Sequence, residues 1–402
     1  MIEEKGKQDS DSALKTADRR LPAGNQTWVE VDLEALTENY RALTTLLAPA
    51  GLGKSHFSSG NPRVIPVVKA NAYGHGMIPV AHALAAAGAT MLAVFFVDEG
   101  VKLREAGISQ DILVLGTSWR GQETAAIQNR LILTVDRLEC IRSLEIAAKS
   151  LGASIPVHLK VDTGMARLGV RWNSMESMLK ALGSTKGICL KGVFSHLSSA
   201  EENDSAFTLE QIRRFEHSLS EIRESGLDCG EIHFANSAGL LYFDALRHWS
   251  ARTGIGLYGY HPDPRRSPVK LRPALSLKSR IGSRRSLEAG EPVGYNRRFQ
   301  ASRRMQLATL CIGYADGFNR GLGNRGCVII QDKLAPVVGT VSMDMIAVDL
   351  TDVPEAKEGD EVIILGSSAH CRVTADDWAA LLQTIPYEIL CAISTRIPRI
   401  YV

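Results

Sequence analysis

The fold of this chain is decided by the stretch VIPVVKANAYGHG, residues 64–76. Its first five residues are all apolar, which is typical of a short strand buried on both faces, and the run ends on Lys69. The lysine therefore stands at the C-terminal end of a predicted strand. Gly74 and Gly76 then allow tight turning before the next helix.

The position of Lys69 matters because of what such a strand end can do. In a barrel of parallel strands this end forms the rim where active sites assemble. Partial burial there lowers the pKa of an ammonium group and frees the amine for Schiff-base chemistry. By itself a lysine at a strand end is more often a solvated side chain, so the rest of the chain has to decide between the two interpretations.

Strand-like and helix-like runs alternate over the next part of the chain. One amphipathic run spans residues 209–224 and ends before Gly226, and its apolar stripe consists of Leu209, Ile212, Phe215, Leu219 and Ile222. Eight units of this kind in about 230 residues predict an α/β fold, a closed (β/α)₈ TIM-like barrel rather than an open doubly wound sheet. The eight apolar strand-like runs are residues 64–68, 91–97, 112–115, 131–135, 155–161, 188–195, 231–235 and 249–256.

A second domain is predicted after the prolines at residues 262 and 264. Thr374, with Asp377 three residues on, predicts a helix start there. We therefore expect a disordered extension over residues 1–26, the barrel over residues 27–262 and a mostly antiparallel β domain over residues 263–402. Residues 28–32, at the start of the predicted barrel domain, alternate like a half-buried strand. The strand-like runs of the β domain are residues 274–281, 305–312, 327–331, 336–341, 345–350 and 361–365.

Composition favours small-molecule chemistry. The 402 residues are 45% hydrophobic and 22% charged, and the formal net charge of +2 gives no reason to expect nucleic acid. Seven widely spaced cysteines without a C-x-x-C pair suit neither a disulfide framework nor a zinc site, so no metal is expected. No apolar run is long enough for a signal peptide or a membrane span, and the expected compartment is the cytoplasm.

Glycines near the eighth predicted strand suggest a phosphate site. The string GIGLYG, residues 254–259, matches G-x-G-x-x-G but does not follow the first strand of a βαβ unit, so it is not a dinucleotide fingerprint. Backbone amides at Gly254 and Ile255 lie where barrels commonly hold a phosphate, and a helix begun by Asn236 and Ser237 would add amides and a hydroxyl. A Schiff-base lysine together with a phosphate cradle suggests pyridoxal 5′-phosphate (PLP).

Four strings carry a resemblance to a known family. They are VVKANAYGHG at 67–76, KVDTGMARLG at 160–169, GYADG at 313–317 and VSMD at 341–344. They closely resemble strings of the alanine racemase family and occur in that family's order, and the resemblance covers about residues 27–402. It implies a PLP-binding barrel and an isomerase that interconverts L-alanine and D-alanine.

The resemblance also implies the roles of individual residues. Lys69 would hold PLP as a Schiff base and act as one of two catalytic bases, and Tyr295 of the partner subunit would be the other base. Arg252 would face the pyridine nitrogen, and His196 would help to orient Tyr295 and Arg252. Phosphate contacts would come from Tyr73, Ser237, Gly254, Ile255 and Tyr387.

Substrate contacts are implied in the same way. Arg167 would contact the phenolic oxygen of PLP and contribute to substrate binding. The backbone amide of Met343 would bind the substrate carboxylate, with Asp344 in a supporting role. Lys160 matches a position that is carbamylated in some members of the family, and we expect a plain lysine here. Each residue type also has an ordinary structural use, since arginines form ion pairs, tyrosines pack at interfaces and methionines fill gaps.

Chemistry gives independent reasons for these residue types. Racemisation removes a proton from one face of a planar carbon and returns one to the other face, so it needs two acid/base groups on opposite sides. An arginine at the pyridine nitrogen keeps its proton, which makes the cofactor a poorer electron sink and restrains side reactions. A tyrosine needs cationic neighbours such as Arg252 to act near neutral pH.

The expected function is therefore that of a homodimeric alanine racemase with shared active sites, which supplies D-alanine for cell-wall peptidoglycan. One alternative is a racemase of broader range that acts on serine and alanine, and assays on several enantiomers would distinguish it. Two others are a non-catalytic PLP-binding protein on the same barrel and a basic amino-acid decarboxylase. Thr253, where the family pattern has proline, and Glu201, where it has aspartate, bear on substrate range rather than reaction type.

Overall fold

The protein is described by a computed structural model that covers residues 26–48, 61–117, 121–202, 204–266 and 268–402. The extension expected over residues 1–26 lies almost wholly outside these residues. By its contacts the chain divides into two compact units. One unit holds Leu36–Ala72 and Val80–Arg272, and the other holds the chain up to Ala35, Tyr73–Pro79 and Pro273–Val402.

The first unit contains a parallel barrel, as predicted. Its strands run in the order β2-β10-β9-β8-β6-β5-β4-β3, and a bridge between Val67 and Ala93 joins the two ends of this order. Every strand is parallel to its neighbours. The strands are β2 (Val64–Pro66), β3 (Met91–Val94), β4 (Asp111–Thr117), β5 (Ile132–Val135), β6 (Ile155–Asp162), β8 (Ile188–Phe194), β9 (Glu231–Ala235) and β10 (Ser250–Thr253).

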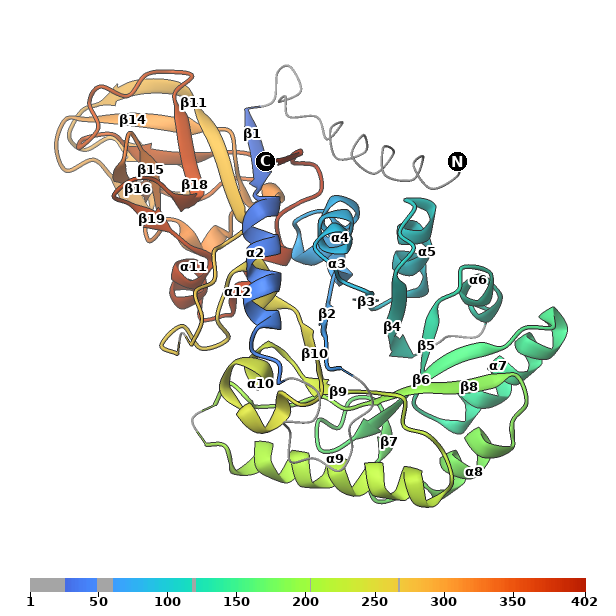
Figure 1. The fold of residues 1–402 in the computed structure, drawn as a ribbon. Coiled ribbons are helices and arrows are strands. Elements are labelled where there is room, and N and C mark those ends of the chain that lie inside the picture. Colours follow the sequence, from blue (N-terminus) through green and yellow to red (C-terminus); the bar gives the residue numbers. More distant parts are fainter. Residues whose placement is uncertain (1–25, 49–60, 118–120, 203, 267) are drawn as a thin grey trace, which may run out of the picture. The chain divides into compact units, whose positions relative to one another are not determined.

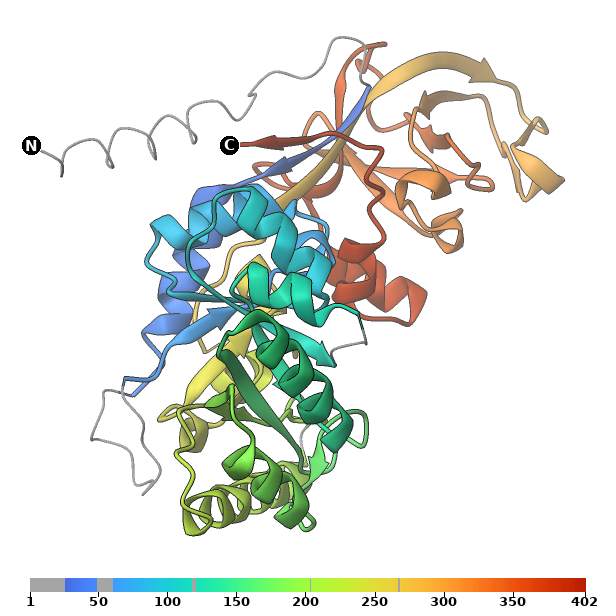
Figure 2. The ribbon, with the colours of Figure 1, turned by 90° about the vertical axis from the view of Figure 1, so that its right-hand side faces the viewer.

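Helices follow the strands along the chain, and Figures 1 and 2 show them outside the barrel strands. The short strand β7 (Val170–Arg171) pairs with the end of β6. The helical segments are α2 (Leu33–Thr44), α3 (Lys69–Tyr73), α4 (Met77–Ala86), α5 (Val97–Glu105), α6 (Glu123–Gln128), α7 (Leu138–Leu151), α8 (Glu176–Ser184), α9 (Ala206–Glu224), α10 (Ser237–Tyr242), η1 (Asp244–Leu246) and η2 (Ile255–Tyr258).

Helix α9 shows how the apolar stripe packs. Phe215 meets Phe234 of β9 with ring centroids 4.6 Å apart and lies edge-on to Trp249 at 5.3 Å. Ile212, Leu219 and Ile222 are buried on the same face. The prediction was wrong for Leu209, which is 46% exposed, because the buried side of the first turns carries Thr208 and Gln211 instead.

The second unit is mostly antiparallel β structure, again as predicted. Its sheet runs β19-β18-β15-β16-β17-β14-β11-β1-β20, and an additional pairing of β18 with β11 closes six of these strands into a ring. Both ribbon views show its orange and red strands gathered together. The strands are β1 (Thr27–Val31), β11 (Leu275–Leu287), β12 (Pro292–Val293), β13 (Phe299–Gln300), β14 (Met305–Leu310), β15 (Cys327–Ile330), β16 (Lys333–Val338), β17 (Ile346–Asp349), β18 (Glu361–Ser367), β19 (Arg372–Val373) and β20 (Arg399–Tyr401).

The first strand of the chain belongs to this second unit. β1 pairs antiparallel with β11 and parallel with β20, so the beginning and the end of the described chain lie side by side. Thr374 caps α11 (Ala375–Leu382) as predicted, because its hydroxyl accepts from the Asp377 amide at 3.1 Å. The remaining helical segments are η3 (Tyr295–Arg297), η4 (Tyr314–Asp316), η5 (Arg320–Leu322) and α12 (Pro386–Cys391).

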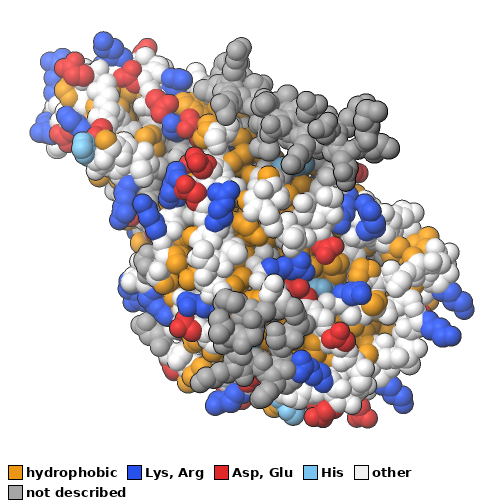
Figure 3. All heavy atoms as spheres, in the orientation of Figure 1, with side chains coloured by type: hydrophobic (Ala, Val, Ile, Leu, Met, Phe, Trp, Pro, Cys, Tyr) orange, Lys and Arg blue, Asp and Glu red, His pale blue; other side chains and the backbone are white. Residues whose placement is uncertain are grey.

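On the face drawn in Figure 3, basic and acidic side chains are interspersed. All seven cysteines carry free thiols. Within the described ranges, no helix combines the length and the apolar character needed to cross a membrane.

Candidate active site

Lys69 lies at the C-terminal end of the first barrel strand, three residues after the last residue of β2, and is the first residue of α3. Its Nζ lies 5.4 Å from the centroid of the Phe95 ring. The four residues that follow, Ala70 to Tyr73, all have a φ of 53°, in the left-handed region. For residues with a side chain this conformation costs about 1–2 kcal/mol each, and such strain concentrates at functional sites.

Glu99 supports this strained turn. Its carboxylate accepts from the Ala70 amide at 2.7 Å and from the amides of Phe95 and Phe96 at 2.8 and 3.0 Å. Glu99 was not among the residues predicted from the sequence. The available signal was its position as the third residue of α5, from which a glutamate reaches back to the helix start.

Arg252 is a buried cation held by neutral acceptors. It is 4% exposed and donates to the backbone oxygens of His233 and Ser195 at 2.8 and 2.6 Å. Its guanidinium also donates to the Nδ1 atoms of His233 at 2.8 Å and of His196 at 3.1 Å. Burial lowers the pKa of Arg252 to about 9, so the guanidinium remains charged at neutral pH.

The two histidines around Arg252 are neutral. Burial, and then the charge of Arg252, hold the pKa of His196 and of His233 well below the ordinary value. A neutral imidazole can offer Nδ1 as an acceptor, which is what a guanidinium donor requires. The contact between His196 and Arg252 agrees with the pairing inferred from the family resemblance.

Lys160 adds another cation to the barrel interior. It is 7% exposed, and its Nζ lies 5.3 Å from the centroid of the Phe194 ring. Burial first, and then the charges of Arg252, Arg167 and Lys69, lower the pKa of Lys160 to about 8, against a smaller opposing effect of Asp136. The same basic side chains lower the pKa of His196.

The loop that carries Arg167 is ordered by its neighbours. The Asp162 carboxylate accepts from the amides of Gly164 and Ala166, both at 3.0 Å. Gln211, buried in α9, donates to the His196 carbonyl at 3.1 Å and accepts from the Ser198 amide at 3.0 Å. Gln211 thus fixes the loop that carries His196, although its polar type gave no sign in the sequence that it would be buried.

Backbone amides converge on Ser237. The amides of Gly254 and Gly256 donate to its hydroxyl at 3.1 and 3.2 Å. Asn236 caps α10 by accepting from the Gly239 amide, and Ile255 opens the 3₁₀ turn η2, whose first amides have no acceptor inside the turn. The groups expected to cradle a phosphate therefore lie together after β9 and β10.

The remaining predicted residues lie in the second unit. The rings of Tyr73 and Tyr387 lie tilted at 47° to each other with their centroids 6.0 Å apart. Burial raises the pKa of Tyr73. Tyr295 is 67% exposed in η3, and its carbonyl accepts from the Thr340 hydroxyl at 2.9 Å. Met343 is 53% exposed.

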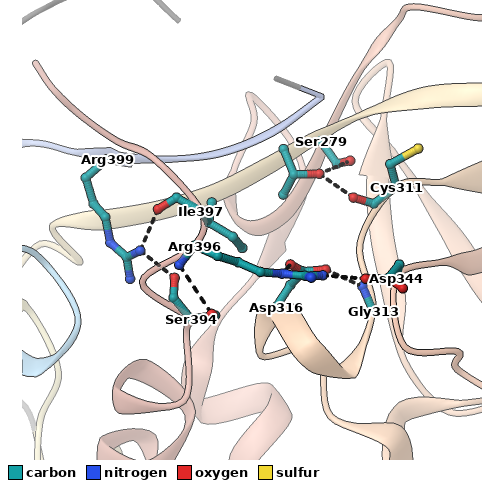
Figure 4. A network of polar contacts seen from close by, with 10 residues as sticks. Ser279, Cys311, Gly313, Asp316, Asp344, Ser394, Arg396, Ile397 and Arg399 are labelled. Carbon is teal, nitrogen blue, oxygen red and sulfur yellow. Dashed lines mark hydrogen bonds and ion pairs between the residues drawn. The ribbon is translucent and has the colours of Figure 1, made fainter. Parts of the chain in front are cut away.

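Arg396 lies in a polar network with Asp316 and Asp344 (Figure 4), and Asp344 follows Met343 in the loop that we call the Met343 loop. The guanidinium pairs with Asp316 at 2.6 Å and with Asp344 at 2.7 Å. Asp316 also accepts from the Gly313 amide, and the amide of Ala315 donates to the Met343 carbonyl at 3.0 Å. Arg396 therefore joins the two loops that contain the GYADG and VSMD strings, and its role was not visible from either string alone.

Comparisons with known proteins identify the family. Residues 31–262 match the family model of the alanine racemase N-terminal domain, and residues 274–401 match that of the C-terminal domain. An alanine racemase of Symbiobacterium thermophilum is 41% identical over 376 residues, which cover 93% of this chain and 97% of that one.

Solved structures support the same family assignment. The alanine racemase of Bacillus anthracis with bound L-Ala-P superposes with a TM-score of 0.87 at 34% identity, covering 95% of this chain and 96% of that one. The alanine racemase of Bartonella henselae with covalently bound pyridoxal phosphate gives a TM-score of 0.82 at 29% identity, over 94% and 100% of the two chains. The barrel and β domain thus place this chain in a class of isomerases. It belongs to the alanine racemase family.

Proposed function

We propose that this protein interconverts L-alanine and D-alanine with PLP by a two-base mechanism, using Lys69 and Tyr295 of the partner subunit. The observation that carries the proposal is the charge of the barrel interior. Lys69, Lys160, Arg167 and Arg252 lie close enough together for their charges to act on the same buried histidine. Such a concentration of positive charge favours an anionic cofactor and an anionic substrate.

The residues present fit PLP. The amides of Gly254 and Gly256 and the Ser237 hydroxyl point toward one another after β9 and β10, which suits a phosphate group. Lys69 offers the amine for a Schiff base. When bound, PLP supplies an electron sink that makes the Cα proton of an amino acid acidic.

The chain's own residues would then manage protons and orientation. Lys69 would remove or return a proton on one face of the substrate, and Tyr295 of the partner subunit would do so on the other. Arg252 keeps its protons at neutral pH because its pKa, although lowered by burial, is still about 9. It would therefore offer a hydrogen bond, and not a free proton, to the pyridine nitrogen.

The exposed residues of the β unit support a homodimer. Tyr295, Tyr314, Met343 and Met345 are large side chains that are exposed in the single chain. Covering such residues with a second copy would remove apolar surface from water. In this arrangement Met343 would bind the substrate carboxylate through its amide, with Asp344 fixed by Arg396. The product D-alanine would supply peptidoglycan synthesis in the cytoplasm.

The first test replaces the lysine. Lys69→Ala should lose the absorbance band of protein-bound PLP and all turnover of either alanine enantiomer, because the proposed site contains no second lysine in the same role. Lys180→Ala, on the exposed side of α8, is the matched control and should keep both. Turnover retained in Lys69→Ala would refute the Schiff-base assignment. Parallel assays with the serine enantiomers measure substrate range.

The second test mixes two inactive variants. In a dimer of one Lys69→Ala chain and one Tyr295→Phe chain, one of the two sites would regain both bases only if Tyr295 acts across the subunit boundary. Random mixing of equal amounts should therefore restore about a quarter of the parent activity, since half the dimers are mixed and half their sites are complete. No recovery in verified mixed dimers would refute the shared site.

A further inference from the structure

A third histidine, His158, extends the hydrogen-bond network of Arg252 across the barrel. His158 on β6 and His233 on β9 are both buried, and His158 Nδ1 lies 2.8 Å from His233 Nε2. Strand β8 runs between them and carries Gly192 opposite His158. A Cβ atom at residue 192 would lie 2.6 Å from His158 Cε1 and 2.7 Å from Nδ1. Because residue 192 is a glycine, His158 can reach over β8.

The protons of this chain of contacts can be assigned from Arg252 outward. A guanidinium only donates, so His233 Nδ1 must be the acceptor of the Arg252 bond. Neutral His233 then carries its proton on Nε2, and this N–H donates a hydrogen bond to His158 Nδ1. His158 in turn must carry its own proton on Nε2. Burial lowers the pKa of His158 to about 3, which agrees with a neutral imidazole.

A different residue fixes the plane of the His233 ring. Phe194 stacks on it with ring centroids 4.8 Å apart and an interplanar angle of 12°. Stacking restrains the ring plane but not the position of the proton, because either tautomer stacks equally well. The tautomer is selected at the two ring nitrogens, where Arg252 donates to Nδ1 and His158 accepts from Nε2.

We propose that His158 is a positioning residue for the racemase reaction: it locks His233 as the Nε2–H tautomer and thereby keeps Arg252 charged and oriented. The proposal rests on the proposed function, in which Arg252 faces the pyridine nitrogen. Without His158 the Nε2–H of His233 would lose its acceptor. His233 could then shift its proton to Nδ1, where it would oppose the guanidinium.

The test compares two substitutions in the full-length holoenzyme. His158→Asn introduces an amide oxygen that can occupy the place of Nδ1 and accept the proton, whereas the ring introduced by His158→Phe cannot accept. Solid-state ¹⁵N NMR of histidine-labelled protein reports which nitrogen of His233 carries the proton. Alanine kinetics and the absorbance of bound cofactor are measured on the same samples.

We expect an Nε2–H His233 in the parent and in His158→Asn. In His158→Phe we expect loss of that hydrogen-bonded signal, a shifted cofactor band and a roughly tenfold lower kcat with little change in KM. A proton on Nδ1 in the parent would overturn the proposal. So would a Phe variant with the parent's tautomer and kcat, or an Asn variant as impaired as the Phe variant, since that would indicate packing alone. The tautomer measurement needs no turnover, so an inactive parent enzyme that retains Nε2–H would instead contradict the proposed function.

Discussion

A substitution at Lys160 can measure how much the burial of a charge lowers the free energy of unfolding of this protein. Its ammonium is buried beside Phe194 and close to the positive charges of Arg252, Arg167 and Lys69. Burial and these charges lower its pKa from the ordinary 10.5 to about 8. The folded protein therefore holds this proton more weakly than the unfolded chain does.

The size and sign of the effect follow from that difference. At about 1.4 kcal/mol for each pKa unit, a drop from 10.5 to about 8 corresponds to roughly 3 kcal/mol. Below pH 8 both states are protonated, so the folded state bears the whole penalty. Between about pH 8 and 10.5 the folded state releases the proton first, so the contribution of Lys160 to stability becomes less unfavourable as pH rises.

Lys160→Met tests this reasoning because it keeps an apolar chain of similar length without the charge. In carbon dioxide-free buffer and at equal protein concentration, urea denaturation at pH 7 should show the variant more stable by up to roughly 3 kcal/mol. The difference should fall toward zero near pH 10. Lys180→Met on the exposed side of α8 is the control and should show no such pH dependence. A variant that is no more stable at pH 7, or a difference that does not change with pH, would refute the reasoning.

Three further substitutions probe other parts of the site. Glu99→Ala should weaken cofactor binding and lower turnover, because three amides around the strained turn lose their acceptor. Glu105→Ala, at the end of the same helix, is the control and should change neither. Titration with PLP measures cofactor affinity in both variants. Arg396→Ala should raise KM for alanine and lower kcat/KM by up to about 100-fold by releasing the Met343 loop, with Arg396→Lys less affected. Tyr295→Phe should suppress solvent proton exchange from one alanine enantiomer far more than from the other, and equal suppression would contradict two separate bases.

Local sequence patterns determined much of the fold. Eight apolar runs became the eight barrel strands, and the Thr374 and Asp377 pair became a capping box. These features depend on neighbouring residues in the chain, namely on the burial of a short apolar run and on a side chain three residues from a helix start. The amine at the end of the first strand and the amides after the last two are consequences of the same alternation, because parallel strands bring their C-terminal ends to one rim.

Tertiary structure decided what depends on partners distant in the sequence. Only the fold pairs β1 with β11 and β20, because a half-buried strand does not specify which edge it joins. Only the fold lets His158 reach His233 over Gly192, and Arg396 reach Asp316 and Asp344. The sequence by itself indicated the lysine and the phosphate-binding amides of the proposed site, but not Glu99, Gln211 or Arg396 around them. The charge states and tautomers in the site were decided by burial and by long-range hydrogen bonds, which no local pattern encodes.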